Sequence, residues 1–179
     1  RFLSKEYAQK VSEVLSSYGI EVYLSEIPIP TPALSFTTMN RKFSAGIMIT
    51  ASHNPACYNG LKIKTEKGGA ATVNITSEIE KILSQENFTS KNRFPENKII
   101  KDNFIKDYIK FLRSYIDIKA FRKERFNILV DPMYGSGNSF IKEILKGIPI
   151  KIEFIRNEIN PSFGGFRPEP VLENLLPSI

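Results

Sequence analysis

Cysteine and histidine are scarce in this chain of 179 residues: each occurs once, as Cys57 and His53, and tryptophan is absent. A single cysteine excludes a disulfide framework and a thiolate metal cluster. The sequence also lacks an apolar run that approaches the ~18 residues of a membrane span, and its first residues lack the apolar core of a signal peptide. These absences favour a globular protein in a reducing, cytoplasmic setting, with no membrane partner.

The net charge of +6 raises the hypothesis of a nucleic-acid partner. The basic excess lies within residues 91–125, whereas residues 1–90 are close to neutral. The basic stretch lacks the interleaved aromatic pattern of a base-stacking surface. We therefore expect a solvated basic face and no nucleic-acid partner.

The composition, with 41% hydrophobic and 25% charged residues, is typical of a globular protein that has a core. Helix-like and strand-like segments alternate along the chain. This alternation predicts an α/β fold with mixed, largely parallel sheets and helices on both faces. The expected helices span 4–19, 33–39, 76–85, 104–115 and 139–146, and residues 171–179 begin another. The expected strands span 20–24, 46–50, 61–64, 127–130 and 150–155.

Residues 87–102 are polar and show neither a helix nor a strand period, so we interpret them as an inter-domain linker. They separate parts of two similar domains, residues 1–86 and residues 103–179. The chain opens on a helix and stops within one, and a parallel sheet of these strands alone would leave uncovered edges. We therefore expect a truncated protein that lacks the first strands of one domain and the end of the other.

The stretch GIMITASHNPACYNGLKI, residues 46–63, places the only histidine beside a serine at the end of an apolar strand. A serine hydrolase needs a base within hydrogen-bond reach of its nucleophile. His53 directly follows Ser52, so in extended backbone the two side chains point apart. The G-x-S-x-G elbow is also absent. These observations argue against acyl transfer by a serine triad.

A second hypothesis is phosphoryl transfer through Ser52, because doubly wound sheets bind ligands at the carboxyl ends of their strands. His53 and Lys62 offer cationic or proton-transfer groups, and Asn54 offers amide donors. The turn dipeptide Asn59-Gly60 predicts a fold-back that brings Lys62 near Ser52. A plainer alternative stays open, in which His53 is solvated and the turn only caps a local bend.

TASHNP followed by YNGLKI resembles the phosphoserine loop of the α-D-phosphohexomutases, which include phosphoglucomutases and phosphomannomutases. Three further segments resemble this family in the expected order: IPIPTPAL (27–34), LVDPMYGSGN (129–138) and FGGFRPEP (163–170). The resemblance spans essentially the whole chain, and the serine loop is its most specific part.

The resemblance implies an intramolecular phosphotransferase that interconverts hexose 1-phosphate and hexose 6-phosphate through a phosphoserine and a bisphosphate intermediate. Ser52 would carry the phosphoryl group and would bind Mg²⁺ through it. His53 and Lys62 would be the catalytic neighbours, implicated in binding and proton transfer, and Asn54 would shape the loop. The implied partner is a hexose phosphate, with glucose, mannose and glucosamine phosphates all open, as is the oligomeric state.

The family holds Mg²⁺ with three aspartates in a D-G-D-x-D-R type loop, which this chain lacks. Its four aspartates are never spaced D-x-D. Also missing are the family's third-domain sugar loop, its fourth-domain phosphate loop and an N-terminal segment with an active-site arginine. We therefore predict that this chain alone is inactive. The alternative is a non-catalytic sugar-phosphate-binding module or an inactive mutase homologue.

Overall fold

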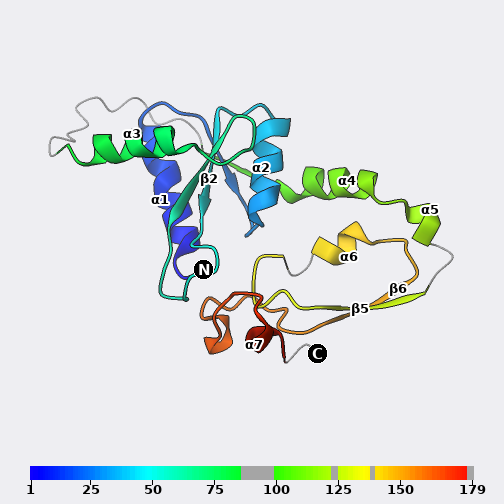
Figure 1. Ribbon diagram of the computed structural model, residues 1–179. Coiled ribbons are helices and arrows are strands. Elements are labelled where there is room, and N and C mark those ends of the chain that lie inside the picture. The colour runs from blue at the N-terminus through cyan, green and yellow to red at the C-terminus, as the bar shows by residue number, and fades with distance from the viewer. Residues whose placement is uncertain (86–98, 122–124, 138–139, 177–179) are drawn as a thin grey trace.

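The computed structural model describes residues 1–85, 99–121, 125–137 and 140–176 (Figure 1). The helices are α1 (Ser4–Ser17), α2 (Thr31–Asn40), α3 (Val73–Leu83), α4 (Ile105–Tyr115), α5 (Ile118–Phe121), α6 (Phe140–Ile144) and α7 (Leu172–Leu175), with a 3-10 turn η1 (Phe163–Gly165). The strands are β1 (Val22–Ser25), β2 (Ala45–Ile49), β3 (Leu61–Thr65), β4 (Ile99–Asp102), β5 (Phe126–Val130) and β6 (Ile150–Phe154). This order confirms the predicted α/β fold.

The strands of the described residues pair two by two. β1 pairs with β4 and β5 pairs with β6, both in parallel, whereas β2 and β3 are antiparallel. The sheets are therefore mixed and largely parallel, as the sequence predicts. The antiparallel pair arises because a short loop, residues 50–60, joins β2 to β3 without a crossover helix.

The last part of the predicted linker, residues 99–102, is a strand and not an irregular segment. Ile99 pairs with Val22 and Asp102 pairs with Ser25, so β4 extends β1 in parallel. The polar residues around Ile99 and Ile100 hide this strand from a pattern analysis, and its partner lies far away in the sequence. Residues 87–98 fall outside the described residues, and the division into domains 1–86 and 103–179 stays a prediction.

Helix α1 begins without a side-chain cap. Ser4 is the first residue of the helix, and Leu3 before it has a left-handed φ of 51° and no side-chain hydrogen bond to the helix. The Ser4 hydroxyl instead accepts a hydrogen bond from Asn59. The start of α1 is thus tied to the loop between β2 and β3.

The buried core lies where α2 meets α4. Phe36 of α2 packs on Phe111 of α4, with ring centroids 4.5 Å apart. Arg41, directly after α2, forms ion pairs with Asp102 and Asp107. The buried members of the cluster are Ile29, Ala33, Leu34, Phe104 and Ile105. The earlier and later halves of the chain therefore share this core.

Gly46 lets β2 approach α2 closely. A Cβ atom at this position would lie 2.4 Å from Thr38 Oγ1 and 3.3 Å from Leu34 Cγ. Thr38 is fully buried, and its hydroxyl donates to the Leu34 carbonyl oxygen. In Figure 1, α1 and α2 lie on opposite sides of β2. This packing fixes the strand that leads into the Ser52 loop.

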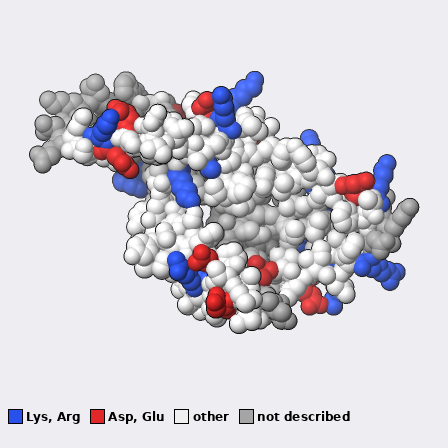
Figure 2. Space-filling model, in the orientation of Figure 1, with Lys and Arg blue, Asp and Glu red and all other residues white. Residues whose placement is uncertain are grey.

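The described helices include none that is both long and apolar enough to cross a membrane. On the face shown in Figure 2, basic and acidic side chains are interspersed and do not form a stripe of one sign. The predicted basic face over residues 91–125 includes 91–98 and 122–124, which lie outside the described residues. That expectation therefore stays a prediction.

Candidate functional site

Ser52 is exposed in the loop that follows β2, and its backbone has a left-handed φ of 52°. A residue other than glycine held in this region costs on the order of 1–3 kcal/mol, and it persists only where its surroundings fix it. The stem of the loop is closed by the Thr50 amide, which donates to the Gly60 carbonyl oxygen at 2.8 Å. Ala51, directly before Ser52, is buried. The serine hydroxyl is thus presented to solvent from a fixed stem.

Lys62 lies beside Ser52, as the turn at Asn59-Gly60 predicts. Its Nζ donates to Ser52 Oγ at 2.5 Å. Lys62 is the second residue of β3 and pairs with Met48 of β2, so the antiparallel ladder sets its position. An ammonium group at this distance stabilises negative charge that develops on the serine oxygen.

His53 and Asn54 take different places in the loop. The His53 side chain is exposed and forms no hydrogen bond or ion pair with another described residue. Asn54 contributes through its backbone, since its amide donates to the Ala51 carbonyl oxygen at 3.0 Å. Its own carbonyl oxygen accepts a hydrogen bond from Arg1 at 2.6 Å. The structure therefore brings Lys62 to Ser52 directly, and does not bring the His53 side chain to it.

Arg1 is a part of this site that the sequence analysis missed. Its Nη1 donates to the carbonyl oxygens of Pro55 and Tyr58 at 3.0 and 2.9 Å. Its Nη2 donates to the carbonyl oxygens of Ser52 and Asn54 at 2.7 and 2.6 Å. Burial lowers the pKa of this guanidinium below its ordinary value. No local pattern reveals these contacts, because the arginine lies more than fifty residues before the loop.

Asn59 ties the far end of the loop to the same N-terminal segment. Its Nδ2 donates to the Phe2 carbonyl oxygen at 2.7 Å and to Ser4 Oγ at 2.9 Å. Its Oδ1 accepts a hydrogen bond from the Gly60 amide at 2.9 Å. Residues 1–4 therefore support both ends of the Ser52 loop.

The loop of the later half, around Phe163, reaches the same arginine. The Arg1 guanidinium carbon lies 5.1 Å from the centroid of the Phe163 ring, within the range of a cation–π contact. Phe163 is only 8% exposed and has a positive φ of 53°. The Ser52 loop and η1, which are far apart in the sequence, therefore both contact the Arg1 guanidinium.

A second arginine, Arg156 after β6, stabilises the turn that follows β5. Arg156 pairs with Asp131 through Nη2, and its Nε donates to Asp131 Oδ1 at 2.9 Å. The same oxygen accepts from the Met133 amide at 3.0 Å. The hydrogen bond from Arg156 to Asp131 raises the pKa of the guanidinium above its ordinary value. Both side chains are more than 90% buried, so this pair fixes the turn.

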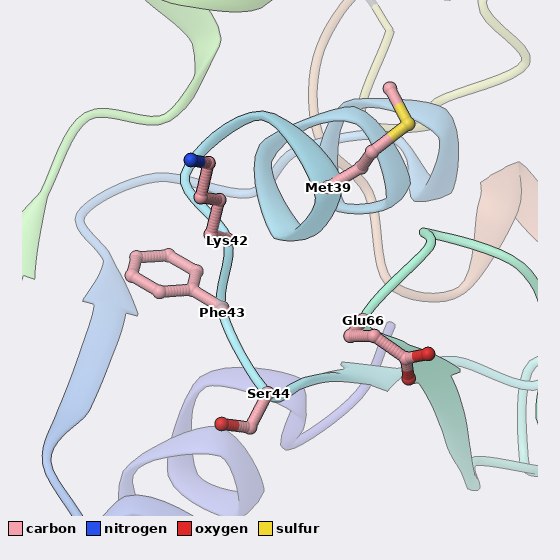
Figure 3. Close-up of a pocket in the computed structure, with 5 residues that line it drawn as sticks. All are labelled: Met39, Lys42, Phe43, Ser44 and Glu66. Carbon is pink, nitrogen blue, oxygen red and sulfur yellow. The ribbon is translucent and has the colours of Figure 1, made fainter.

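The hollow in Figure 3, of about 520 Å³, lies away from Ser52. It adjoins the start of β2, whereas Ser52 follows its end, so the five-residue strand separates them by roughly 17 Å. The labelled side chains in Figure 3 do not point to a common centre. Its lining residues are Met39, Lys42, Phe43, Ser44 and Glu66. This hollow does not belong to the serine site.

Within the described residues, no group of three or more His, Cys, Asp or Glu side chains could hold a metal ion. Mg²⁺ is usually bound by carboxylates together with phosphate oxygens of a substrate. The described residues by themselves therefore do not make up a magnesium site.

The fold and the loop place the chain among α/β proteins that present a serine beside a lysine at the end of a strand. Residues 1–90 match the family model described as phosphoglucomutase/phosphomannomutase, alpha/beta/alpha domain I, and residues 106–179 match that of domain II. The chain belongs to the phosphoglucomutase/phosphomannomutase family.

Curated relatives agree with this assignment. A phosphoglucosamine/phosphogalactosamine mutase of Sulfurisphaera tokodaii is 31% identical over 163 residues, which cover 90% of this chain and 36% of the relative. A phosphoglucomutase/phosphomannomutase of Thermococcus kodakarensis is 30% identical over 146 residues, covering 82% of this chain and 32% of the relative. The chain spans about a third of the length of these relatives.

Solved structures show the same fold. A Thermus thermophilus protein, crystallised as a candidate phosphomannomutase, superposes with a TM-score of 0.86 at 33% identity, covering 99% of this chain and 40% of that protein. A phosphoglucomutase/phosphomannomutase family protein of Burkholderia thailandensis gives a TM-score of 0.79 at 19% identity, covering 98% of this chain and 38% of that protein. The second match supports the fold alone.

Proposed function

We propose that this chain contributes the phosphoserine loop of a phosphohexomutase, an intramolecular phosphotransferase acting on hexose phosphates. The observation that carries the proposal is the hydrogen bond from Lys62 Nζ to Ser52 Oγ on an exposed, closed loop. Two relatives named as mutases of hexose or hexosamine phosphates support the same chemistry. Because the chain spans only a third of their length, the activity is assigned to a protein of their size.

In the first half-reaction, a hydroxyl oxygen of the hexose monophosphate attacks the phosphorus of phosphorylated Ser52. The new O–P bond forms as the Oγ–P bond breaks, which yields a hexose 1,6-bisphosphate and free Ser52. In the second half-reaction, Ser52 Oγ attacks the other phosphorus of the bisphosphate and the bond from that phosphorus to the sugar oxygen breaks. The sugar oxygen takes up the proton that the serine hydroxyl releases, which yields phosphorylated Ser52 and the isomeric hexose monophosphate. Phosphate is conserved overall, and only its position on the sugar changes.

Lys62 is placed to stabilise the negative charge on Ser52 Oγ when the Oγ–P bond breaks. His53 is the candidate to take the proton of the attacking sugar hydroxyl, since it is exposed on the same loop. Asn54 shapes the loop through its backbone hydrogen bonds. Because Ser52 is exposed, a phosphoryl group on its hydroxyl would face solvent, where a substrate can reach it.

Magnesium enters this proposal only as a cation bound to the phosphate of Ser52. The described residues do not complete its coordination, and we derive no step through the metal. Hexose phosphates are the proposed substrate class, with no preference among sugars. We also propose a cytoplasmic location, which the use of a single cysteine fits.

The 179-residue chain alone is expected to be inactive as a mutase. Catalysis of phosphate-ester chemistry requires a barrier lower by ~20 kcal/mol or more. One preorganised electrostatic contact contributes about 3–4 kcal/mol. Lys62 and His53 together fall far short of that total. Robust interconversion of glucose 1-phosphate and glucose 6-phosphate by the purified chain would contradict this expectation.

The decisive experiment measures the intact mass of the complete protein that contains this chain, after incubation with glucose 1,6-bisphosphate. We expect a gain of one phosphoryl group, mapped by peptide sequencing to Ser52 and lost in Ser52→Ala. Ser44→Ala is the matched control, because Ser44 is an exposed serine at the opposite end of β2. Phosphorylation elsewhere, or sugar-phosphate binding without modification of Ser52, would support the non-catalytic alternative.

A further inference from the structure

Resting on the proposed function, we infer that Arg1 is a positioning residue, which holds the Ser52 loop in the conformation that phosphoryl transfer needs. Four backbone carbonyl oxygens of this loop accept hydrogen bonds from its guanidinium: those of Ser52, Asn54, Pro55 and Tyr58. Arg1 lies outside the motif of the serine loop, more than fifty residues before it.

The donor geometry explains why the residue is an arginine. A guanidinium has five N–H donors in a rigid planar fork, and the four on Nη1 and Nη2 match the four carbonyl oxygens. A lysine ammonium has three donors that radiate from one nitrogen, so it cannot reach both ends of the loop. The contact therefore depends on the shape of the side chain as well as on its charge.

The contact acts on Ser52 itself. Its carbonyl oxygen is one of the four acceptors, and its φ of 52° is a conformation that needs outside support. Arg1 holds the backbone carbonyl of Ser52 and Lys62 holds its hydroxyl, so both the backbone and the side chain of the nucleophile are positioned. Without Arg1, the loop loses the support that offsets the strain at Ser52.

Arg1 also retains its charge beside the loop. Among the described residues, no carboxylate forms an ion pair with it, and its guanidinium lies over the face of the Phe163 ring. Neutral carbonyl groups orient the guanidinium without neutralising it. The positive charge therefore favours a phosphoryl group on the neighbouring serine.

Hydrogen exchange in the 179-residue chain tests the structural part of the inference. In Arg1→Ala, the Asn54 and Tyr58 amides, which donate to the Ala51 and Pro55 carbonyl oxygens, are expected to exchange at least about tenfold faster, since their turns lose the hydrogen bonds from Arg1 that hold the loop carbonyls in place. The matched control is Arg113→Ala, because Arg113 also donates to two backbone carbonyls, those of Glu143 and Ile144, away from the loop. The control should leave both loop amides unchanged. Equal exchange in wild type and Arg1→Ala would overturn the inference.

Kinetics in the complete protein test the functional part. We expect Arg1→Ala to lower kcat about 100-fold, the size of effect that a misplaced reacting group produces, with KM within about twofold. Arg1→Lys should recover only a small fraction, whereas free guanidinium ions should partly restore Arg1→Ala. An unchanged kcat, or full activity in Arg1→Lys, would overturn the inference.

The two proposals fail in different ways. If Ser52 of the wild-type protein never accepts a phosphoryl group, the proposed function fails, while the exchange comparison still decides whether Arg1 holds the loop. If wild type is phosphorylated and Arg1→Ala changes neither exchange nor kcat, only the inference about Arg1 fails. Should Arg1→Ala lose its circular dichroism spectrum, the same measurements on Arg1→Lys decide.

Discussion

Arginine fixes a loop in each half of the molecule, but by opposite chemistry. Arg1 donates to neutral backbone carbonyls of the Ser52 loop, which is exposed. Arg156 pairs with the carboxylate of Asp131 at the turn after β5, and both side chains are buried. Both loops contain residues with positive φ, Ser52 in one and Met133 in the other. Strained backbone is thus supported by a guanidinium in both places.

The difference lies in what happens to the positive charge. At the turn after β5, Asp131 neutralises Arg156 within the protein, which suits a structural element. At the Ser52 loop, the acceptors are carbonyl dipoles, so the charge of Arg1 and that of Lys62 remain available to an anion. The Ser52 loop therefore presents positive charge that no carboxylate in the described part of the chain neutralises, whereas the charge at the turn after β5 is neutralised within the protein.

Removing the carboxylate should have the largest effect on stability. Asp131→Asn leaves the Arg156 guanidinium buried without its counter-charge, and breaking a buried pair costs about 3–5 kcal/mol. We expect a corresponding fall in the free energy of unfolding, measured by urea denaturation of the 179-residue chain. A loss below about 1 kcal/mol would show that the turn after β5 does not depend on neutralisation of the Arg156 charge by Asp131.

The control for this measurement is Glu153→Gln, which breaks the exposed pair between Lys151 and Glu153 on β6. The hydrogen bond from Lys151 lowers the pKa of Glu153 below its ordinary value of 4.5. Such a group stabilises the fold above that value, and the contribution is lost as the pH falls through the folded-state pKa. Because solvent screens this pair, the urea midpoint at pH 7 should not change measurably.

Lys62→Met should slow the phosphorylation of Ser52 and leave stability nearly unchanged, whereas Asp131→Asn should mainly lower stability. The lysine is exposed, so the free energy of unfolding should change by less than about 0.5 kcal/mol. Phosphorylation of Ser52 by glucose 1,6-bisphosphate should slow about 100-fold, because an electrostatic contact to the reacting oxygen is lost. The rate is measured by intact mass over time in the complete protein. A large loss of stability with an unchanged rate would reverse the comparison between the loops.

Gly164→Ala tests how closely η1 packs against Tyr134 in the turn after β5. Its effect on the free energy of unfolding should be smaller than that of Asp131→Asn. A Cβ atom there would lie 2.7 Å from Tyr134 Cε2, and the glycine has a φ of 63°. We expect a loss of about 1–2 kcal/mol in the free energy of unfolding, from strain at a left-handed position and from the clash. Gly137→Ala is the matched control, since its Cβ would meet no atom within 4 Å. Equal midpoints for the two variants would contradict this packing.

The features that could be predicted from the sequence are those that depend on residues close together in the chain. The alternating periods predict the α/β elements, and the turn at Asn59-Gly60 predicts that Lys62 returns to Ser52. Strand β4 escapes the pattern because two isoleucines sit among polar residues and the pairing with β1 is non-local. The role of Arg1 escapes for the same reason, since its partners are backbone atoms of a distant loop, and backbone acceptors carry no sequence signature.

The position of Arg1 between the Ser52 loop and the Phe163 ring has a thermodynamic consequence. A ligand that shifts the loop changes the free energy of the contact at Phe163, and by reciprocity a change at Phe163 alters ligand affinity at the loop by the same factor. The two ends of this contact are therefore linked sites. A small molecule that displaces the Phe163 ring would therefore change the affinity of the loop for its ligand without touching Ser52.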